Sequence, residues 1–257
     1  MNRQYLDRDY HHEIYSDERI LLQDKIVLHF LDIGTNIGTI SKNQWLFFVA
    51  GPIGAGKSSV VEFLLERGYL PLESPTIVDM DKIRILLPEY SHLIRTNPLC
   101  AGLRTQKESG LIAEILVISA IQMGKSVIFE GTLRHMEWYT SYMARLRELF
   151  TSLRLGVIHV KCDMNLIKSR VQKRAYETQR NIPDHILIES ASVTVKSLLP
   201  LLPMLHILIC VDNTAGLESV LHPEEGVSGV QMKSDLKCPR LLIPGTSWDL
   251  LKDFYLR

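Results

Sequence analysis

Residues 46–65, LFFVAGPIGAGKSSVVEFLL, join an apolar run to a glycine-rich turn and then to a helical pattern that begins after Lys57. The turn fits G-x-x-x-x-G-K-[ST] from Gly51 to Ser58. Glycines allow the backbone to turn its N–H groups inward around a phosphate, and the N-terminus of the following helix adds partial positive charge. The stretch therefore predicts a phosphate-binding loop between a buried strand and a helix.

Each residue of such a loop has an expected role. Lys57 is expected to reach the β- and γ-phosphates of a nucleotide, and the Ser58 hydroxyl to ligate Mg²⁺. The predicted nucleotide-binding residues are Gly51, Pro52, Ile53, Gly54, Ala55, Gly56, Lys57, Ser58 and Ser59. We find no N-K-x-D motif of the kind with which GTPases read guanine, and the chain is short for a motor.

The rest of the chain alternates strand and helix patterns. Apolar strand candidates lie at 45–50, 76–80, 126–130, 155–161 and 206–211, and helical patterns at 57–67, 105–123, 136–152, 163–178 and 184–199. This alternation predicts an α/β fold of the P-loop NTPase or kinase type, with a mostly parallel central sheet and helices on both faces. We expect an N-terminal extension (1–44) with an amphipathic helix starting after Ser16, a P-loop kinase domain (45–215), and a C-terminal tail (216–257). The last residues of that tail, 246–257, are compatible with a short helix.

Composition narrows the classes of protein. The 257 residues carry 29 Lys plus Arg and 29 Asp plus Glu, so net charge gives no reason to expect a general nucleic-acid or membrane surface. The four cysteines form no CxxC pair, which makes a zinc site or a disulfide framework unexpected. The N-terminus lacks a signal-peptide core, and the longest apolar stretch, 198–211, is too short for a bilayer. A cytoplasmic protein is the expectation.

Acidic residues end two of the predicted strands. Asp79 and Asp81 follow the strand at 76–80, and Glu130 ends the strand at 126–130. Ligands of parallel sheets bind outside the carboxyl ends of the strands, so Asp81 could take a proton from a hydroxyl that attacks the γ-phosphate. Glu130 could hold Mg²⁺, its water shell or a substrate hydroxyl. The alternatives are a helix N-cap for Asp81 and a solvated strand end for Glu130.

Residues 165–185 are rich in cations. The candidates are Lys168, Arg170, Lys173, Arg174 and Arg180. An arginine accelerates phosphoryl transfer when its guanidinium stabilises the negative charge on the oxygens of the transferring group. Arg174 and Arg180 flank a break before Pro183, as a lid over a nucleotide would, whereas most charges on such a helix are simply solvated.

Three blocks together, the loop, DMDKIRILLPEY (79–90) and IFEGTLR (128–134), resemble the zeta toxin family. Its members are P-loop kinases, and the bacterial toxins phosphorylate a sugar hydroxyl of UDP-N-acetylglucosamine with ATP. The resemblance runs from Trp45 to Asn213. It implies that Asp81 is the catalytic base, with Arg84 in register, and that Glu130 and Thr132 lie at the substrate and metal site.

The resemblance extends to other blocks. Glu114 lies sixteen residues before Glu130, as does the family's substrate-contacting helix glutamate, and Glu108 is a second candidate. RAYETQRNIPDH (174–185) is similar to the family's nucleotide-phosphate arginines, which implies roles for Arg174 and Arg180. VDNT (211–214) is similar to the loop near the adenine in many such kinases. The N-terminal helix, the tail and residues 91–110 have no close counterpart, and an antitoxin-like protein partner stays unknown.

The leading hypothesis is a Mg·ATP-dependent kinase that acts on a hydroxyl of a small molecule, a nucleotide sugar by resemblance. The expected catalytic residues are Lys57, Asp81, Arg174 and Arg180; those at the substrate are Asp81, Arg84, Glu114, Glu130 and Thr132; those at the metal are Ser58 and Glu130. One alternative is another acceptor: a nucleotide, a dinucleotide cofactor, an antibiotic or a polynucleotide end. The other is a non-catalytic ATP-binding regulator, which would have no use for a base at Asp81.

Overall fold

The computed structural model describes residues 2–6, 14–31, 44–66, 70, 72, 74–133, 135–178, 182 and 184–214. In chain order the elements are η1 (Arg3–Tyr5), α1 (Asp17–Leu31), β1 (Trp45–Ala50), α2 (Lys57–Glu66), β2 (Thr76–Asp79), α3 (Met80–Ile85), α4 (Tyr90–Thr96), α5 (Pro98–Arg104), α6 (Gln106–Gln122), β3 (Val127–Glu130), α7 (Met136–Leu149), β4 (Arg154–Lys161), α8 (Met164–Thr178), α9 (Asp184–Leu201), η2 (Leu202–Met204) and β5 (Ile207–Asp212).

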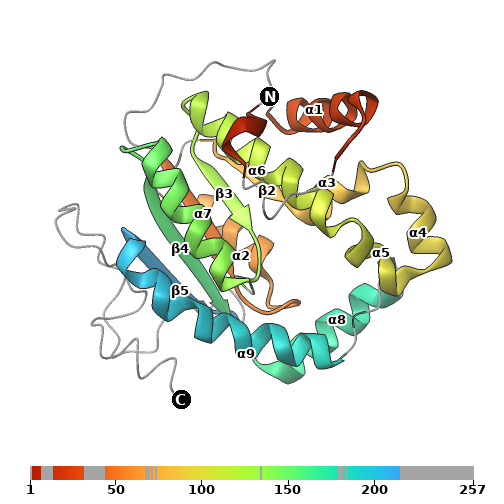
Figure 1. The fold of residues 1–257 in the computed structure, drawn as a ribbon. Coiled ribbons are helices and arrows are strands. Elements are labelled where there is room, and N and C mark those ends of the chain that lie inside the picture. The colour runs from red at the N-terminus through yellow and green to blue at the C-terminus, as the bar shows by residue number, and fades with distance from the viewer. Residues whose placement is uncertain are drawn as a thin grey trace.

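The five strands form one parallel sheet in the order β2-β3-β1-β4-β5 (Figure 1). The strand that leads into the phosphate loop, β1, is therefore the central one. In the register of the sheet, Val49 of β1 pairs with Glu130 of β3 on one side and with Ile158 of β4 on the other. The predicted α/β fold with a parallel sheet is confirmed.

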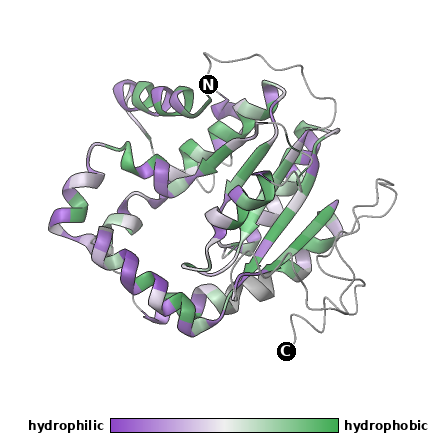
Figure 2. Cartoon of the chain, turned by 180° about the vertical axis from the view of Figure 1, so that it is seen from behind, coloured by the Kyte–Doolittle hydropathy of each residue, from purple (hydrophilic) through white to green (hydrophobic). Residues whose placement is uncertain are grey.

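Alternate residues of β1 enter two cores on opposite faces of the sheet. Leu46, Phe48 and Ala50 belong to the core that α1, α6 and α7 cover, whereas Phe47 and Val49 belong to the core that α2 and α8 cover. Figure 2 shows the strands as largely hydrophobic, while the helices mix hydrophobic and hydrophilic residues. A parallel sheet buried on both faces requires this composition.

The N-terminal helix is part of the main core. The Ser16 hydroxyl accepts a hydrogen bond from the Arg19 backbone N–H, as expected of an N-cap, and Asp17 and Glu18 lie in the first turn. Ile26, Val27 and Leu31 of α1 share the core that contains Leu46, Phe48 and Ala50. The extension therefore packs onto the same layer as α6.

The predicted strands and long helices agree with the observed ones to within one to three residues at most ends. Residues 80–104 differ, because they form three short helices, α3, α4 and α5, in a stretch that has no clear helical period. The suggested helix at 246–257 lies outside the described residues. None of the helices in the described ranges combines the length and the apolarity that a bilayer crossing requires.

Candidate active site

The phosphate loop depends on glycine at three positions. Gly51, Gly54 and Gly56 have φ values of 143°, 85° and 83°, which side-chain-bearing residues rarely adopt. A Cβ on Gly51 would lie 2.3 Å from the Val160 carbonyl oxygen, and one on Gly56 would lie 2.4 Å from Nδ2 of Asn213. Both space and backbone conformation therefore require glycine here.

Lys57 starts α2 and bends its side chain back over the loop. Its ammonium donates hydrogen bonds to the carbonyl oxygens of Gly51 (3.2 Å) and Pro52 (3.0 Å). Burial lowers the pKa of Lys57 to about 8, although the nearby carboxylates of Glu130 and Asp81 act in the opposite direction. Because the Lys57 ammonium is poorly solvated here, a bound anion would strongly stabilise its charged form.

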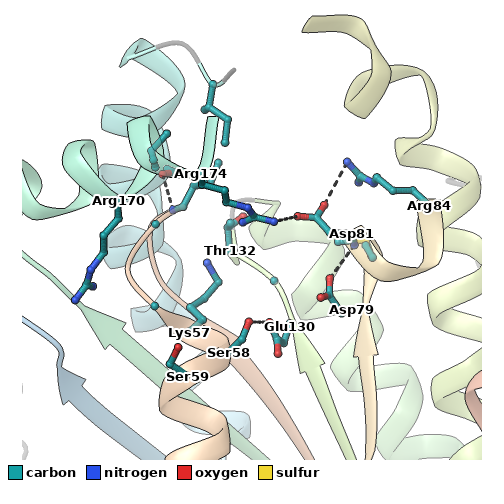
Figure 3. Close-up of a pocket in the computed structure, with 18 of the residues that line it drawn as sticks. Lys57, Ser58, Ser59, Asp79, Asp81, Arg84, Glu130, Thr132, Arg170 and Arg174 are labelled. Atoms are coloured by element: carbon teal, nitrogen blue, oxygen red, sulfur yellow. Dashed lines mark hydrogen bonds and ion pairs between the residues drawn. The ribbon is translucent and has the colours of Figure 1, made fainter. Parts of the chain in front are cut away.

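Two acids meet at the carboxyl ends of β2 and β3. Asp79 and Glu130 are partners in the β2–β3 register, and the Ser58 hydroxyl donates a 2.8 Å hydrogen bond to the Glu130 carboxylate (Figure 3). Burial raises the pKa of Glu130, the Ser58 hydrogen bond lowers it, and the Asp79 charge raises it again, with a net upward shift. Glu130 is thus a half-buried strand end whose carboxylate is hydrogen-bonded to Ser58.

Asp81 points into the site rather than capping its helix. The Asp79 carboxylate accepts a 2.8 Å hydrogen bond from the Asp81 backbone N–H, so the N-cap of α3 is Asp79. One carboxylate oxygen of Asp81 lies 3.4 Å from a terminal guanidinium nitrogen of Arg84. The other carboxylate oxygen lies 3.9 Å from a terminal guanidinium nitrogen of Arg174. Figure 3 shows the carboxylate between these two arginines, which come from α3 and α8.

One cavity of about 430 Å³ collects most of the predicted site. The predicted residues that line it are Ile53, Gly54, Gly56, Lys57, Ser58, Ser59, Asp81, Arg84, Glu130, Thr132 and Arg174. Gly51, Pro52 and Ala55 of the same loop are buried behind its surface. The phosphate loop and the acids at the strand ends thus face one shared space.

Two predicted residues stand apart from this cavity. Glu114 is fully buried on α6, and its carboxylate lies 3.1 Å from Arg145 of α7. It does not line the cavity, and its role at the substrate stays a prediction. Glu108 accepts hydrogen bonds from Arg19 and Gln23 of α1 instead of facing the cavity. Arg180 lies outside the described residues.

The cavity also contains residues that were not predicted. They include Met80, Gln106, His135, Tyr139, Val171, Ile182 and Ser190, whereas Asp79, Gly131 and Arg170, which also line the cavity, already stood out in the sequence. No motif in the sequence marks His135 or Tyr139 as a site residue. His135 directly precedes α7, and Tyr139 lies in its first turns, in a helix with an ordinary amphipathic pattern. Arg170 was one of several cations on α8 that sequence could not rank.

Arg170 and Asn213 fix the phosphate loop from behind. The Asn213 side-chain amide donates to the Ala55 carbonyl oxygen at 2.9 Å, and Arg170 donates to the same oxygen at 3.3 Å. Arg170 also donates to the Asn213 carbonyl oxygen at 3.4 Å. The loop is therefore tied to the end of β5, where the VDNT stretch lies, and to α8.

The donor set suits a hard cation. Ser58 and Glu130 offer a hydroxyl and a carboxylate within 2.8 Å of each other, and oxygen donors are what Mg²⁺ prefers. Within the described residues, no group of three or more His, Cys, Asp or Glu side chains could hold a metal by itself. Mg²⁺ usually binds through one or two protein groups together with substrate phosphates, so Ser58 and Glu130 fit that mode.

One family model matches a stretch of the chain that contains most of this geometry, apart from Asn213 and the end of β5. A model of the zeta toxin family matches residues 35–200, which is more than half of the chain. The chain belongs to the zeta toxin family. The predicted resemblance is therefore confirmed, and the matched range of this zeta toxin family member contains the phosphate loop, Asp81, Glu130 and Arg174.

Solved structures resemble the fold of this family member. A chain of the PezAT chromosomal toxin–antitoxin system of Streptococcus pneumoniae is 21% identical with a TM-score of 0.58, and the match covers 75% of each chain. A putative kinase from Chloroflexus aurantiacus is 18% identical with a TM-score of 0.49 over 67% of this chain and 89% of that one. The AvrRxo1-ORF1:-ORF2 structure with ATP gives 13% identity and a TM-score of 0.50, over 74% of this chain and 61% of that one.

At these identities the likeness concerns the fold, which is that of a P-loop kinase-like protein. The comparison with curated proteins returned no match.

Proposed function

We propose that this zeta toxin family member is a Mg·ATP-dependent phosphotransferase that moves the γ-phosphoryl group to a hydroxyl of a small molecule. The observation that carries the proposal is that Asp81 and Lys57 line the same cavity. A nucleotide-binding regulator needs the lysine, but it gains nothing from a carboxylate aimed at the phosphate site. A kinase needs both.

The phosphate loop and its cations would bind and orient ATP. Backbone N–H groups at the start of α2 would cradle the phosphates, and the Lys57 ammonium would exchange its two carbonyl partners for phosphate oxygens. Arg174 reaches into the cavity from α8 and would meet the negative charge of the transferring group. Arg180 is proposed as a second cation of this kind on the basis of the family resemblance.

Mg²⁺ would be held by Ser58 and Glu130 together with the nucleotide's phosphates. When bound, the metal neutralises charge on the β- and γ-phosphate oxygens. Glu130 is half-buried beside Asp79 and has a raised pKa, so a nearby cation would also stabilise its ionised form.

Asp81 is proposed as the group that orients and deprotonates the acceptor hydroxyl. Arg84 is buried, and its position 3.4 Å from the Asp81 carboxylate restricts where that carboxylate can lie. Asp81 itself is about one-third exposed, so an acceptor can reach it from the cavity. Proton transfer to a carboxylate placed in this way contributes about 10²–10⁴ in rate.

We call the part of the cavity lined by Arg84, Gln106, Thr132, His135 and Tyr139 the acceptor half, because the acceptor would bind there. This part is polar, and its side chains offer several hydrogen-bond donors. A polyhydroxylated acceptor would satisfy such a surface, and family membership makes UDP-N-acetylglucosamine the first acceptor to test. Glu114 as a substrate contact is also part of this proposal and rests on the resemblance alone.

A phosphorus NMR time course tests the proposal. The full chain is mixed with Mg·ATP, with and without UDP-N-acetylglucosamine, beside the Lys57→Ala and Asp81→Asn variants. We expect a new phosphomonoester signal that needs both the acceptor and Lys57. Asp81→Asn should bind ATP nearly as well as the parent chain but lose at least about 10²-fold in transfer rate.

The other outcomes separate the alternatives. Retained transfer by Asp81→Asn would remove Asp81 as the base. Product from a metabolite extract but not from UDP-N-acetylglucosamine would keep the kinase and change its acceptor. ATP binding without any phosphorylated product, from the sugar nucleotide or the extract, would favour the non-catalytic regulator.

A further inference from the structure

Helices α4 and α5, residues 90–104, form an insertion in the chain between α3 and α6, two helices that contribute residues to the acceptor half of the cavity. We call this insertion the α4–α5 excursion. It departs after Glu89, which follows α3, and it returns at Thr105, where α6 begins. In Figure 1 these two helices extend away from the sheet on the side where β2 and α3 lie. α5 also approaches the site closely, since a Cβ on Gly102 would lie 3.2 Å from Arg84.

Arg19 of α1 connects the two ends of this excursion. Its guanidinium donates two hydrogen bonds of 2.6 Å to Glu108, in the first turn of α6, and a further one to Glu89. Gln23, which is fully buried on the same face of α1, donates a 2.7 Å hydrogen bond to Glu108. A single side chain from the N-terminal helix thus holds together residues that lie 19 positions apart.

The same two ends lie next to residues that line the cavity, Arg84 and Gln106. Gln106 begins α6, two residues before Glu108, and its side-chain oxygen accepts a 3.0 Å hydrogen bond from Arg84. Arg84 lies in α3, whose C-terminal end leads to Glu89, and it contacts Asp81 at 3.4 Å. A change in the spacing between α3 and the start of α6 would therefore move Gln106 relative to Arg84, and Arg84 would lose the hydrogen bond that orients its guanidinium beside Asp81.

We propose that Arg19 is a positioning residue for the acceptor half of the cavity, because it holds the two ends of the α4–α5 excursion together. The physical reason is charge. Glu89 and Glu108 are both carboxylates within reach of one guanidinium, and the Glu108 side chain is only 10% exposed. Without the cation they repel each other, and Glu108 keeps a buried charge beside the neutral amide of Gln23.

Hydrogen exchange on the full chain tests the positioning role without any acceptor. In Arg19→Met we expect faster amide exchange across residues 86–106 and unchanged exchange in the phosphate loop and α2, residues 51–66. The Kd for Mg·ATP should stay within about twofold of the parent value, because the side-chain hydrogen bonds of Arg19 go to Glu89 and Glu108 and not to the loop. Arg154→Met is the matched control, since Arg154 packs over Trp45 at the opposite end of the sheet.

A charge-neutral rescue separates positioning from simple loss of packing. In Arg19→Met with Glu108→Gln, the repulsion with Glu89 is gone, and the amide oxygen introduced by the second substitution can still accept from Gln23. We therefore expect the double variant to recover most of the protection across residues 86–106. Exchange that rises equally in residues 51–66 and 86–106, or a double variant no better protected than the single one, would overturn the proposal.

The kinetic readout rests on the proposed function. With UDP-N-acetylglucosamine as the acceptor, Arg19→Met should raise the acceptor KM by about tenfold and leave the ATP KM nearly unchanged. An equal rise in both KM values would contradict the positioning role. If the parent chain makes no product, the proposed acceptor fails, and the exchange pattern and its rescue still decide the role of Arg19.

Discussion

The Ser58 hydroxyl donates a 2.8 Å hydrogen bond to the Glu130 carboxylate, although 72 residues separate the two in the chain. The contact arises because β3 lies beside β1, and Glu130 is in register with Val49 just before the phosphate loop. An acid at the end of one strand thus meets the hydroxyl that begins the helix after the neighbouring strand. This relationship joins the phosphate loop to the strand-end acids.

Glu130→Gln should stabilise the fold while reducing transfer. The pKa of Glu130 is raised in the fold, mainly by burial, so its ionised form is disfavoured relative to the unfolded chain. Its contribution to stability is therefore present at low pH and is lost as pH rises through the folded pKa. We expect a higher Tm for Glu130→Gln at pH 7 and a difference that shrinks toward pH 4.5, measured by thermal unfolding. A Tm below that of the parent chain at pH 7 would contradict this assignment.

ATP affinity should weaken at alkaline pH because of Lys57. With a pKa lowered to about 8, only about one-tenth of the lysines are protonated at pH 9, so the apparent Kd should be roughly tenfold higher than at neutral pH. Phosphate binding favours the protonated form, so the complex should take up a proton near pH 8. Titration calorimetry in buffers of different ionisation enthalpy measures both effects. Lys57→Ala should bind more weakly and show no alkaline step, and a step of equal size in that variant would assign it to another group.

Asn213→Ala should weaken ATP binding from a position behind the phosphate loop. The substitution removes the 2.9 Å hydrogen bond to the Ala55 carbonyl oxygen and leaves the longer one from Arg170. Loss of about 1 kcal/mol corresponds to a roughly fivefold higher Kd, which calorimetry resolves. Thr214→Val is the control, because the Thr214 hydroxyl contacts Asp163 and not the loop. Equal Kd values for both variants would mean that Asn213 does not stabilise the loop.

Arg145→Met should destabilise the whole fold. It removes the Arg145 guanidinium from the fully buried carboxylate of Glu114, and breaking such a pair costs about 3–5 kcal/mol. The cost should lie toward the lower end of this range, since the Arg145 side chain is 24% exposed. Urea denaturation measures it, and Arg145→Met with Glu114→Gln should recover part of the loss.

Glu114→Gln separates the two roles of this glutamate. If Glu114 only stabilises the core, the variant should unfold more easily and keep the parent chain's acceptor KM. A raised acceptor KM at unchanged stability would instead support the substrate contact that the family resemblance implies.

Several features follow from local sequence. The spacing from Gly51 to Ser58 predicted the loop between β1 and α2, because left-handed backbone conformations and close approach both require glycine. Continuous apolar runs predicted the strands, since a parallel sheet is buried on both faces. Asp81 and Glu130 could be placed near the loop because the carboxyl ends of parallel strands share one edge of the sheet.

Other features were decided by tertiary structure alone. The period of α6 could not tell whether Glu114 faces the cavity or the core, because residues 111–121 of this helix are buried on every side. Likewise, Arg19 meets Glu108 across 89 residues, and Asn213 meets Ala55 across 158. Propensity and periodicity describe neighbours along the chain, whereas these contacts depend on the order of the strands and on how the helices pack over them.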